Sequence, residues 1–258
     1  MSTPRDRDDF DDRGDDARGW QEPADLGSEA REESPAPMWP SGPRQRRGSL
    51  GTGGPWRVRG DVAKVFAGEG DLVGAQGWAL SRGWSISDGS GPEDAALQAL
   101  IASAPVRATK DDRAASVLRG RAGALELVAF DVVYPLRNRL VPRYAITAAP
   151  LLLPVPGFRL SPARLWRHRT AGLVPLASGN EAFDARWLLL AAEDDPRLRR
   201  LIEDPAVQGL LLGSDDGDEF WSAAGHIAVI RPDGHRPLLI EHHARLLTAL
   251  VTVLHADY

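Results

Sequence analysis

Two short segments most constrain what this chain can fold into, because each places an acidic residue inside a strand-like apolar run. The first extends from Val128 to Tyr134 with an acid at Asp131, and the second from Asn180 to Trp187 with an acid at Asp184. Short apolar runs rich in β-branched and aromatic residues are typical of strands. The two segments therefore predict a sheet-based fold, and no catalytic signature accompanies them.

The N-terminal part of the chain has a different composition from the rest. Residues 1–33 carry twelve acids against five arginines, a net charge of −7 in a chain of 258 residues whose net charge is −5. Such an apolar-poor segment buries too little surface to offset the entropy of ordering. Residues 34–55 are rich in Pro, Gly, Ser and Arg, as flexible linkers are. We predict a disordered acidic tail and linker over residues 1–55, with a basophilic kinase motif at Ser49, and a single domain over residues 60–258.

The composition also excludes several classes of site and partner. The chain has no cysteine, so it forms no disulfide, thiolate metal site or thiol nucleophile. Its start lacks the basic-then-apolar pattern of a signal peptide, and no run of about eighteen apolar residues indicates a membrane span. Beyond residue 33 the net charge is only +2, which argues against binding to nucleic acid through phosphate contacts. We expect a cytoplasmic protein without a nucleic-acid partner.

From about residue 60 onward, the periodicity of apolar residues predicts short strands separated by helices. The predicted strands cover residues 84–88, 116–120, 124–134, 143–153, 158–160, 183–192, 219–223 and 226–230. The predicted helices cover residues 72–80, 92–102 and 161–166, two segments that begin at Asp195-Pro196 and Asp204-Pro205, and residues 237–255. This order predicts an α+β fold, with a mostly antiparallel sheet flanked by helices.

A glycine-rich segment from Gly68 to Gly74 is the one candidate for a nucleotide site. Its G-x-G-x-x-x-G spacing matches that of short-chain dehydrogenases, where the glycines let backbone amides approach a pyrophosphate. No Tyr-x-x-x-Lys accompanies it, because the only lysines are Lys64 and Lys110, and the βα alternation of a dinucleotide-binding sheet is absent. A glycine-broken helix start is the better interpretation, and no cofactor is expected.

The histidines and clustered acids do not match a known metal motif. Glu241-His242-His243 lies in the predicted last helix, but neither H-E-x-x-H nor H-x-x-E-H is present. Neighbouring helical residues point about 100° apart, so at most one of the two histidines faces a shared site. The acids between Asp215 and Glu219 do not match a calcium-binding loop. We therefore expect surface histidines, a solvated acidic turn and no metal.

Three charged residues remain as candidates for interaction: Asp131, Asp184 and Arg186. Asp131 and Asp184 could form a carboxylate pair, but acids on a sheet face are more often solvated or paired with a cation. In a strand that begins at Phe183, Asp184 and Arg186 share one face, opposite to Phe183 itself. We predict that the pair lies at the exposed beginning of that strand, and we expect no catalytic residue.

The order of segments resembles a family of proteins from high-GC bacteria that is defined by a domain of unknown function. The resemblance rests on Gly83-Trp84-Ser85-Ile86, Val117-Leu118-Arg119-Gly120, the segments 128–134 and 180–187, Leu153-Pro154, Ser161-Pro162 and the two acid-proline helix starts. Members of that family commonly begin with a transmembrane anchor and a short basic linker, where this chain has an acidic tail. The family has no established activity, so the resemblance implies none here.

Taken together, the sequence predicts a non-enzymatic binding or protein-interaction module with an unknown protein partner. A soluble enzyme that binds a nucleotide at Gly68–Gly74 is the alternative, and a structural partner in peripheral contact with a membrane protein is a third. A module should present a shallow apolar or charged patch, whereas an enzyme should have a cleft with converging polar groups.

Overall fold

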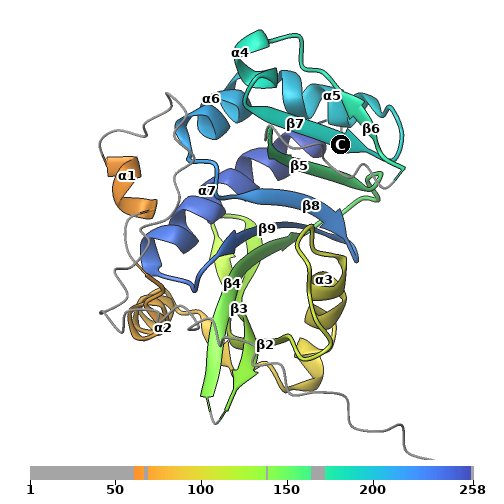
Figure 1. Cartoon of the computed structure of the whole chain (residues 1–258). Coiled ribbons are helices and arrows are strands. Elements are labelled where there is room, and N and C mark those ends of the chain that lie inside the picture. Colours follow the sequence, from red (N-terminus) through yellow and green to blue (C-terminus); the bar gives the residue numbers. More distant parts are fainter. Residues whose placement is uncertain (1–60, 67–68, 138, 164–171, 257–258) are drawn as a thin grey trace, which may run out of the picture. The chain divides into compact units, whose positions relative to one another are not determined.

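The computed structural model describes residues 61–66, 69–137, 139–163 and 172–256. It confirms the predicted α+β class, because one antiparallel sheet is flanked by helices (Figure 1). The strands are β1 (Ser85–Ser87), β2 (Arg113–Ala122), β3 (Leu125–Leu136), β4 (Arg139–Pro150), β5 (Phe158–Pro162), β6 (Val174–Leu176), β7 (Trp187–Ala191), β8 (Glu219–Ala223) and β9 (His226–Pro232). The helices are α1 (Asp61–Phe66), α2 (Leu72–Ser81), the 3-10 helix η1 (Pro92–Asp94), α3 (Leu97–Ser103), α4 (Glu181–Asp184), α5 (Pro196–Glu203), α6 (Pro205–Gly213) and α7 (Pro237–Leu254). The predicted tail and linker lie outside the described residues.

The nine strands of the sheet follow the order β1-β2-β3-β4-β9-β8-β5-β7-β6. Strands β1 to β4 pair as sequence neighbours, but the centre of the sheet joins distant segments, since β4 pairs with β9 and β5 with β8. All of these pairs are antiparallel. The C-terminal hairpin β8–β9 therefore connects the early strands to β5, β7 and β6.

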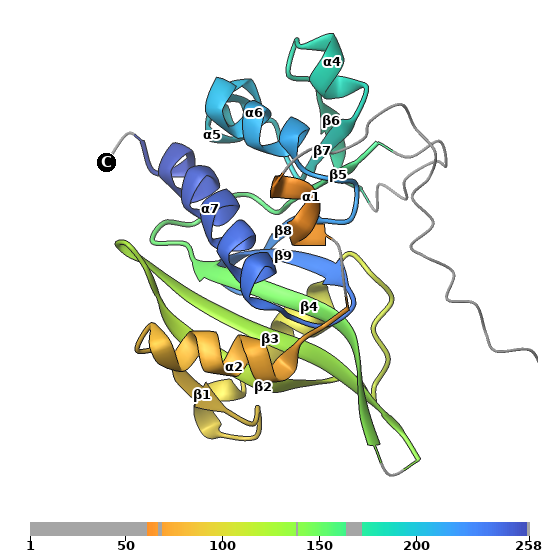
Figure 2. The ribbon, with the colours of Figure 1, turned by 90° about the vertical axis from the view of Figure 1, so that its left-hand side faces the viewer.

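Helices cover both faces of the sheet (Figures 1 and 2). On one face, α2, α5, α6 and α7 pack against strand residues that include Ala129. On the other face, α3 packs through Leu97 and Leu100 against residues that include Phe130. Ala129 and Phe130 are consecutive in β3, so the alternation of side chains along a strand divides the core into two layers.

Helix ends follow the predicted signals. Gly83 takes φ 73° after α2, and Trp84 N–H donates to the carbonyl of Ala79, which is the Schellman arrangement for ending a helix. Asp195 and Asp204 cap α5 and α6 by accepting from backbone amides, each with a proline in the first turn. Local capping chemistry thus fixes where these helices begin and end.

Two predicted elements are wrong. The segment that begins at Phe183 is not a strand there, because the Asn180 side chain accepts from the amides of Ala182 and Phe183 and so caps the short helix α4. Strand β7 begins only at Trp187. Ser161 and Pro162 do not start a helix either, since both belong to β5 and pair with β7. The remainder of that predicted helix lies outside the described residues.

Helix α7 is the main element that covers the centre of the sheet. Among the described residues it is the one helix with the length and composition of a membrane span, and more than half of it is buried within the domain. It contacts α1, α2, α5 and α6 as well as strands β3, β4 and β9. That placement is typical of a core helix.

Candidate functional site

A set of buried polar side chains lies under the N-terminal half of α7. We call the following seven residues the buried polar network: Asp131, Thr147, Asp218, Arg231, His235, His242 and His243. Strand alternation places the side chains from β3, β4 and β9 on the face that α7 covers. The register partners of Thr147 are Ala129 and Val229, which belong to the core layer under α7. Asp131 and Arg231 both pair with Ala145, which packs with Leu239 of α7. The turn before β8, the loop before α7 and α7 itself supply the rest. All seven side chains are buried.

A chain of short contacts crosses the network. Asp131 Oδ1 lies 2.8 Å from His235 Nδ1 and also accepts from the His235 backbone amide. The Thr147 hydroxyl lies 3.2 Å from His235 Nε2 and 2.9 Å from His243 Nδ1. His243 Nε2 is 3.3 Å from Asp218 Oδ1. The Thr147 hydroxyl can donate to His243 Nδ1 while His243 Nε2–H donates to Asp218, which suits a neutral His243.

The electrostatics of the network depend on Asp218. Burial alone would raise the pKa of Asp218, but His243, His242 and Arg231 lower it well below its ordinary value. Burial lowers the pKa of His243 to about 4, so this imidazole is neutral at pH 7. Arg231 Nη1 donates to Asp218 Oδ1 at 2.9 Å and to Asp215. Although burial opposes this, the two carboxylates raise the pKa of Arg231, which stays charged.

The network contains the components of a hydroxyl–histidine–carboxylate triad, but its hydroxyl is closed off from solvent. Thr147 is fully buried, and none of the described pockets is lined by it or by its histidine partners. Within the described part of the chain, no three histidine, aspartate or glutamate side chains converge to hold a metal ion. The arrangement is therefore one of internal charge compensation.

The acidic turn that was predicted to be solvated is partly buried. Asp218 and Glu219 are buried, and Arg231 binds both Asp215 and Asp218. The prediction was wrong because a buried arginine from β9, more than ten residues later in the chain, holds the turn against the sheet. The periodicity of apolar residues in the sequence does not reveal such a distant partner.

The three candidate interaction residues occupy separate environments. Asp131 is part of the buried polar network, and the half-buried Asp184 accepts from the Ser178 amide at 3.0 Å. Arg186 is buried, where it donates to Asp216 at 3.0 Å and to the carbonyls of Leu212 and Ser214.

This placement excludes the carboxylate pair that the sequence disfavoured, and it overturns the expected exposed pair. Strands β4, β9, β8 and β5 separate β3 from β7, and neighbouring strands lie about 4.8 Å apart, so Asp131 and Asp184 form no carboxylate pair. Asp184 and Arg186 form no exposed pair either, because the chain there is a capped helical turn whose two side chains bind different partners.

The glycine segment is used for packing. Gly70 lies so close to the backbone of Gly234 that an added Cβ would be 2.8 Å from the Gly234 Cα. The Gly74 amide donates to Asp71 Oδ1 at 2.9 Å, so a carboxylate occupies the place where a phosphate would bind. No described pocket is lined by the residues of this segment, and Gly68 lies outside the described residues. These contacts do not support the nucleotide alternative.

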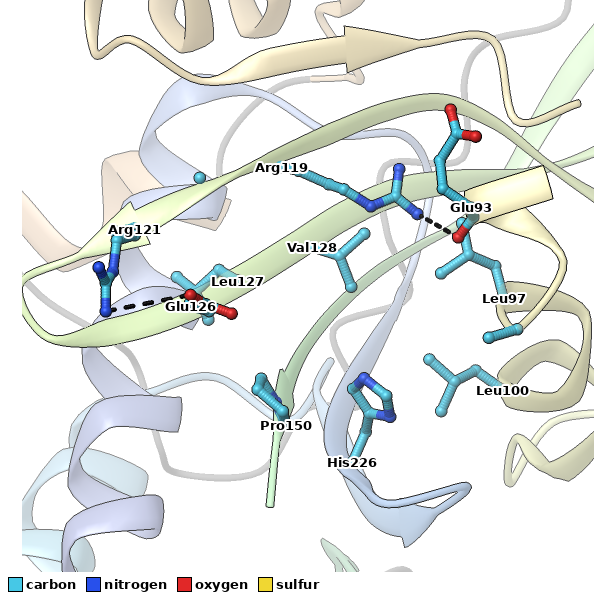
Figure 3. Close-up of a pocket in the computed structure, with 12 residues that line it drawn as sticks. Glu93, Leu97, Leu100, Arg119, Arg121, Glu126, Leu127, Val128, Pro150 and His226 are labelled. Carbon is cyan, nitrogen blue, oxygen red and sulfur yellow. Dashed lines mark hydrogen bonds and ion pairs between the residues drawn. The ribbon is translucent and has the colours of Figure 1, made fainter. Parts of the chain in front are cut away.

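A groove of about 430 Å³ lies beside α3 on the opposite face of the sheet (Figure 3). Leu97, Leu100, Val128 and Pro150 line it. Its two arginines already have partners, since Arg119 lies 2.5 Å from Asp94, and Arg121 lies 4.0 Å from Glu126. Leu97 and Leu100 are only 3% and 1% exposed, so little apolar surface remains for a ligand to cover.

Helix α2 presents the opposite situation, because it exposes apolar side chains. Val73 is 81% exposed, Leu80 64% and Leu72 41%, while Ala75 and Ala79 are buried against the core. Val73, Gly77 and Leu80 follow helical spacing on one side, and Gly77 has nothing within 4 Å of where a Cβ would be. We call Leu72, Val73, Gly77 and Leu80 the α2 face. It is a shallow apolar patch of the kind that a binding module requires.

Comparison with known proteins gives one informative likeness. No family model and no curated protein matches the chain. The crystal structure of the mycobacterial trehalose monomycolate transport factor A, TtfA, matches with a TM-score of 0.52 at 15% sequence identity. The match covers 71% of this chain and 94% of the TtfA chain. At this identity the likeness concerns the fold, and the domain described here is similar in fold to that of a transport factor.

Proposed function

We propose that this domain is a non-enzymatic protein-interaction module that binds an apolar helix of a partner protein at the α2 face. The exposure of Val73 and Leu80 is the observation that carries the proposal. A helix that is apolar on all sides is normally buried, yet one side of α2 has no covering segment among the described residues. Moving a valine or leucine side chain out of water stabilises a complex by about 1.5–3 kcal/mol.

The shape and the border of the α2 face favour a helical occupant. Gly77 leaves a gap between Val73 and Leu80 into which a second helix can pack closely. At the far end of α2, Arg82 pairs with Glu241 at 3.0 Å and lies over the Trp78 ring. An apolar centre with a charged border is the usual anatomy of a protein interface.

Other observations agree with an accessory role. The triad-like residues are closed off from solvent, and the two arginines of the groove beside α3 are paired. The solved structure of similar fold is that of a transport factor, and we infer that this chain acts through a partner. A membrane protein as that partner, the cytoplasmic location and the resemblance to the high-GC family stay predictions.

Site-specific photo-crosslinking in the native host tests the proposal. A photoreactive residue at Val73 of the full chain should give a discrete adduct with one partner protein. The matched control position is Leu152, which is 82% exposed but lies outside α2. It should give no such adduct.

A second variant distinguishes specific binding from nonspecific crosslinking. Leu80→Asp introduces a charge into the α2 face without touching the core, so it should abolish the adduct at position 73 while leaving the thermal melt unchanged. Equal adducts at positions 73 and 152, or an adduct that survives Leu80→Asp, would overturn the proposal.

A further inference from the structure

The β3–β4 hairpin extends beyond the rest of the sheet. On one side the pairing of β2 with β3 ends at Arg113 and Val133, and on the other side the pairing of β9 with β4 ends at Pro232 and Tyr144. The described residues from 134 to 143, which we call the hairpin tip, therefore form a ribbon of two strands with no further strand beside it. Figure 2 shows this ribbon projecting at the lower right, away from α2 and α7.

The hairpin tip combines apolar and basic side chains at its end. Leu136 is 52% exposed and Leu140 46%, and the exposed Arg137 and Arg139 lie between them in the sequence. The sequence holds no acid from Val132 to Tyr144. Arg137 and Arg139 make no ion pair with any described residue, so their charges are available to a ligand.

The base of the ribbon is held firmly in place. Arg143 pairs with the buried Asp112 at 3.0 Å, and its guanidinium lies 4.7 Å from the centre of the Tyr134 ring. This arginine is thus occupied inside the domain, whereas Arg137 and Arg139 at the end are not. The ribbon presents its end in a fixed direction.

We propose that the hairpin tip binds an anionic lipid surface. Leucines that enter the headgroup region, next to arginines that bind lipid phosphates, are the usual chemistry of interfacial anchors. An acidic protein surface would pair with the arginines but would leave Leu136 and Leu140 in water. This surface lies apart from the α2 face, so the two proposals stand independently.

Flotation of the full chain with lipid vesicles tests this inference. The protein should float with vesicles that contain phosphatidylglycerol and far less with pure phosphatidylcholine, and the difference should shrink as salt is raised. The chain as a whole has a net charge of −5, so attraction to an anionic vesicle must come from a local basic surface. Each arginine near the surface should contribute about fivefold to binding.

Variants assign the binding to the hairpin tip. Arg137→Gln combined with Arg139→Gln, and separately Leu136→Ser combined with Leu140→Ser, should each reduce flotation severalfold without changing the thermal melt. Val73→Asp and Arg121→Gln, which alter exposed positions elsewhere, should float like the parent protein. The lipid assignment would be overturned if the parent protein did not float, or if it bound neutral vesicles equally well. It would also be overturned if the hairpin variants floated normally but lost the crosslink at position 73.

Discussion

Helices α7 and α2 pack on the same face of the sheet, and they depart from the usual distribution of residues in opposite ways. Helix α7 buries a polar residue, His243, while α2 exposes apolar residues, Val73 and Leu80. Both ring nitrogens of His243 have partners inside the domain, whereas the exposed side chains of α2 have no covering segment in the described structure. A buried polar residue that has hydrogen-bond partners inside the domain contributes to stability. An apolar residue that stays exposed to water indicates a surface for a partner.

The largest effect should follow from removing the acid at the centre of the network. Asp218→Ala leaves His243 without its hydrogen-bond acceptor and removes one of the two carboxylates that bind Arg231. Breaking a buried pair in this way lowers the free energy of unfolding by about 3–5 kcal/mol. Denaturant unfolding measures the change. Asp194→Ala is the control, because the pair of Asp194 with Arg199 is exposed to solvent and should contribute little to stability. Equal effects of the two variants would show that burial of the network contributes nothing.

The pH dependence of stability should come next in size. Above pH 6.5 His243 is neutral in both the folded and the unfolded chain. Below pH 6.5 the unfolded chain binds a proton that the folded protein accepts only near pH 4, so stability is lost as the pH falls through this window. The loss amounts to about 3 kcal/mol.

Unfolding of the parent protein and of His243→Gln at several pH values measures this dependence. The variant should show a flatter curve between pH 6.5 and 4. A parent protein that becomes more stable on acidification, or a variant with an unchanged slope, would contradict a neutral buried His243.

The contact between Gly70, just before α2, and Gly234, just before α7, should tolerate an added methyl group less well than the exposed side of α2 does. Gly70→Ala forces a methyl group against the Gly234 backbone, and overpacking of this kind costs about 1–3 kcal/mol. Gly77→Ala should instead stabilise the domain by about 0.5–1 kcal/mol, since alanine is the better helix former and space is free there. Thermal melts of the two variants should therefore move in opposite directions.

The smallest effect on stability should come from the α2 face. Val73→Asp lies on the surface, and such substitutions usually change stability by less than about 0.5 kcal/mol. The same variant should nevertheless abolish a crosslink placed at Leu80. A large loss of stability would mean that Val73 is covered by another segment of the chain, and the contrast with α7 would fail.

Much of the fold was predictable because its signals are local. The helix predicted over residues 72–80 is α2, and the Asp-Pro steps at Asp195 and Asp204 started their helices as predicted. The prediction failed at Phe183, where apolar periodicity outweighed the capping signal of Asn180. The predicted strands stop at residue 134 and resume at residue 143, whereas β3 and β4 continue through Pro135 and Pro142, because a ribbon with free edges accepts proline within its strands.

The buried polar network was not predictable, because its members meet only in the folded chain. Asp131 and His235 are 104 residues apart, and Thr147 and His243 are 96 residues apart. One signal was present, since His243 shares the apolar side of the predicted last helix with Leu239 and Leu246. A histidine at such a position requires buried partners, but the sequence does not say which strands supply them.

Helix α7 is the last element of the domain in chain order, and this order determines when the domain can close during synthesis. Strand β4 finds its neighbour β9 only after more than seventy further residues have been made, and α7 follows β9. Until residues 237–254 leave the ribosome, the apolar layer between the early strands and the helices has no cover. Until α7 has been made, the nascent domain therefore keeps a hydrophobic surface open, which is the condition under which chaperones bind and misassembly competes with folding.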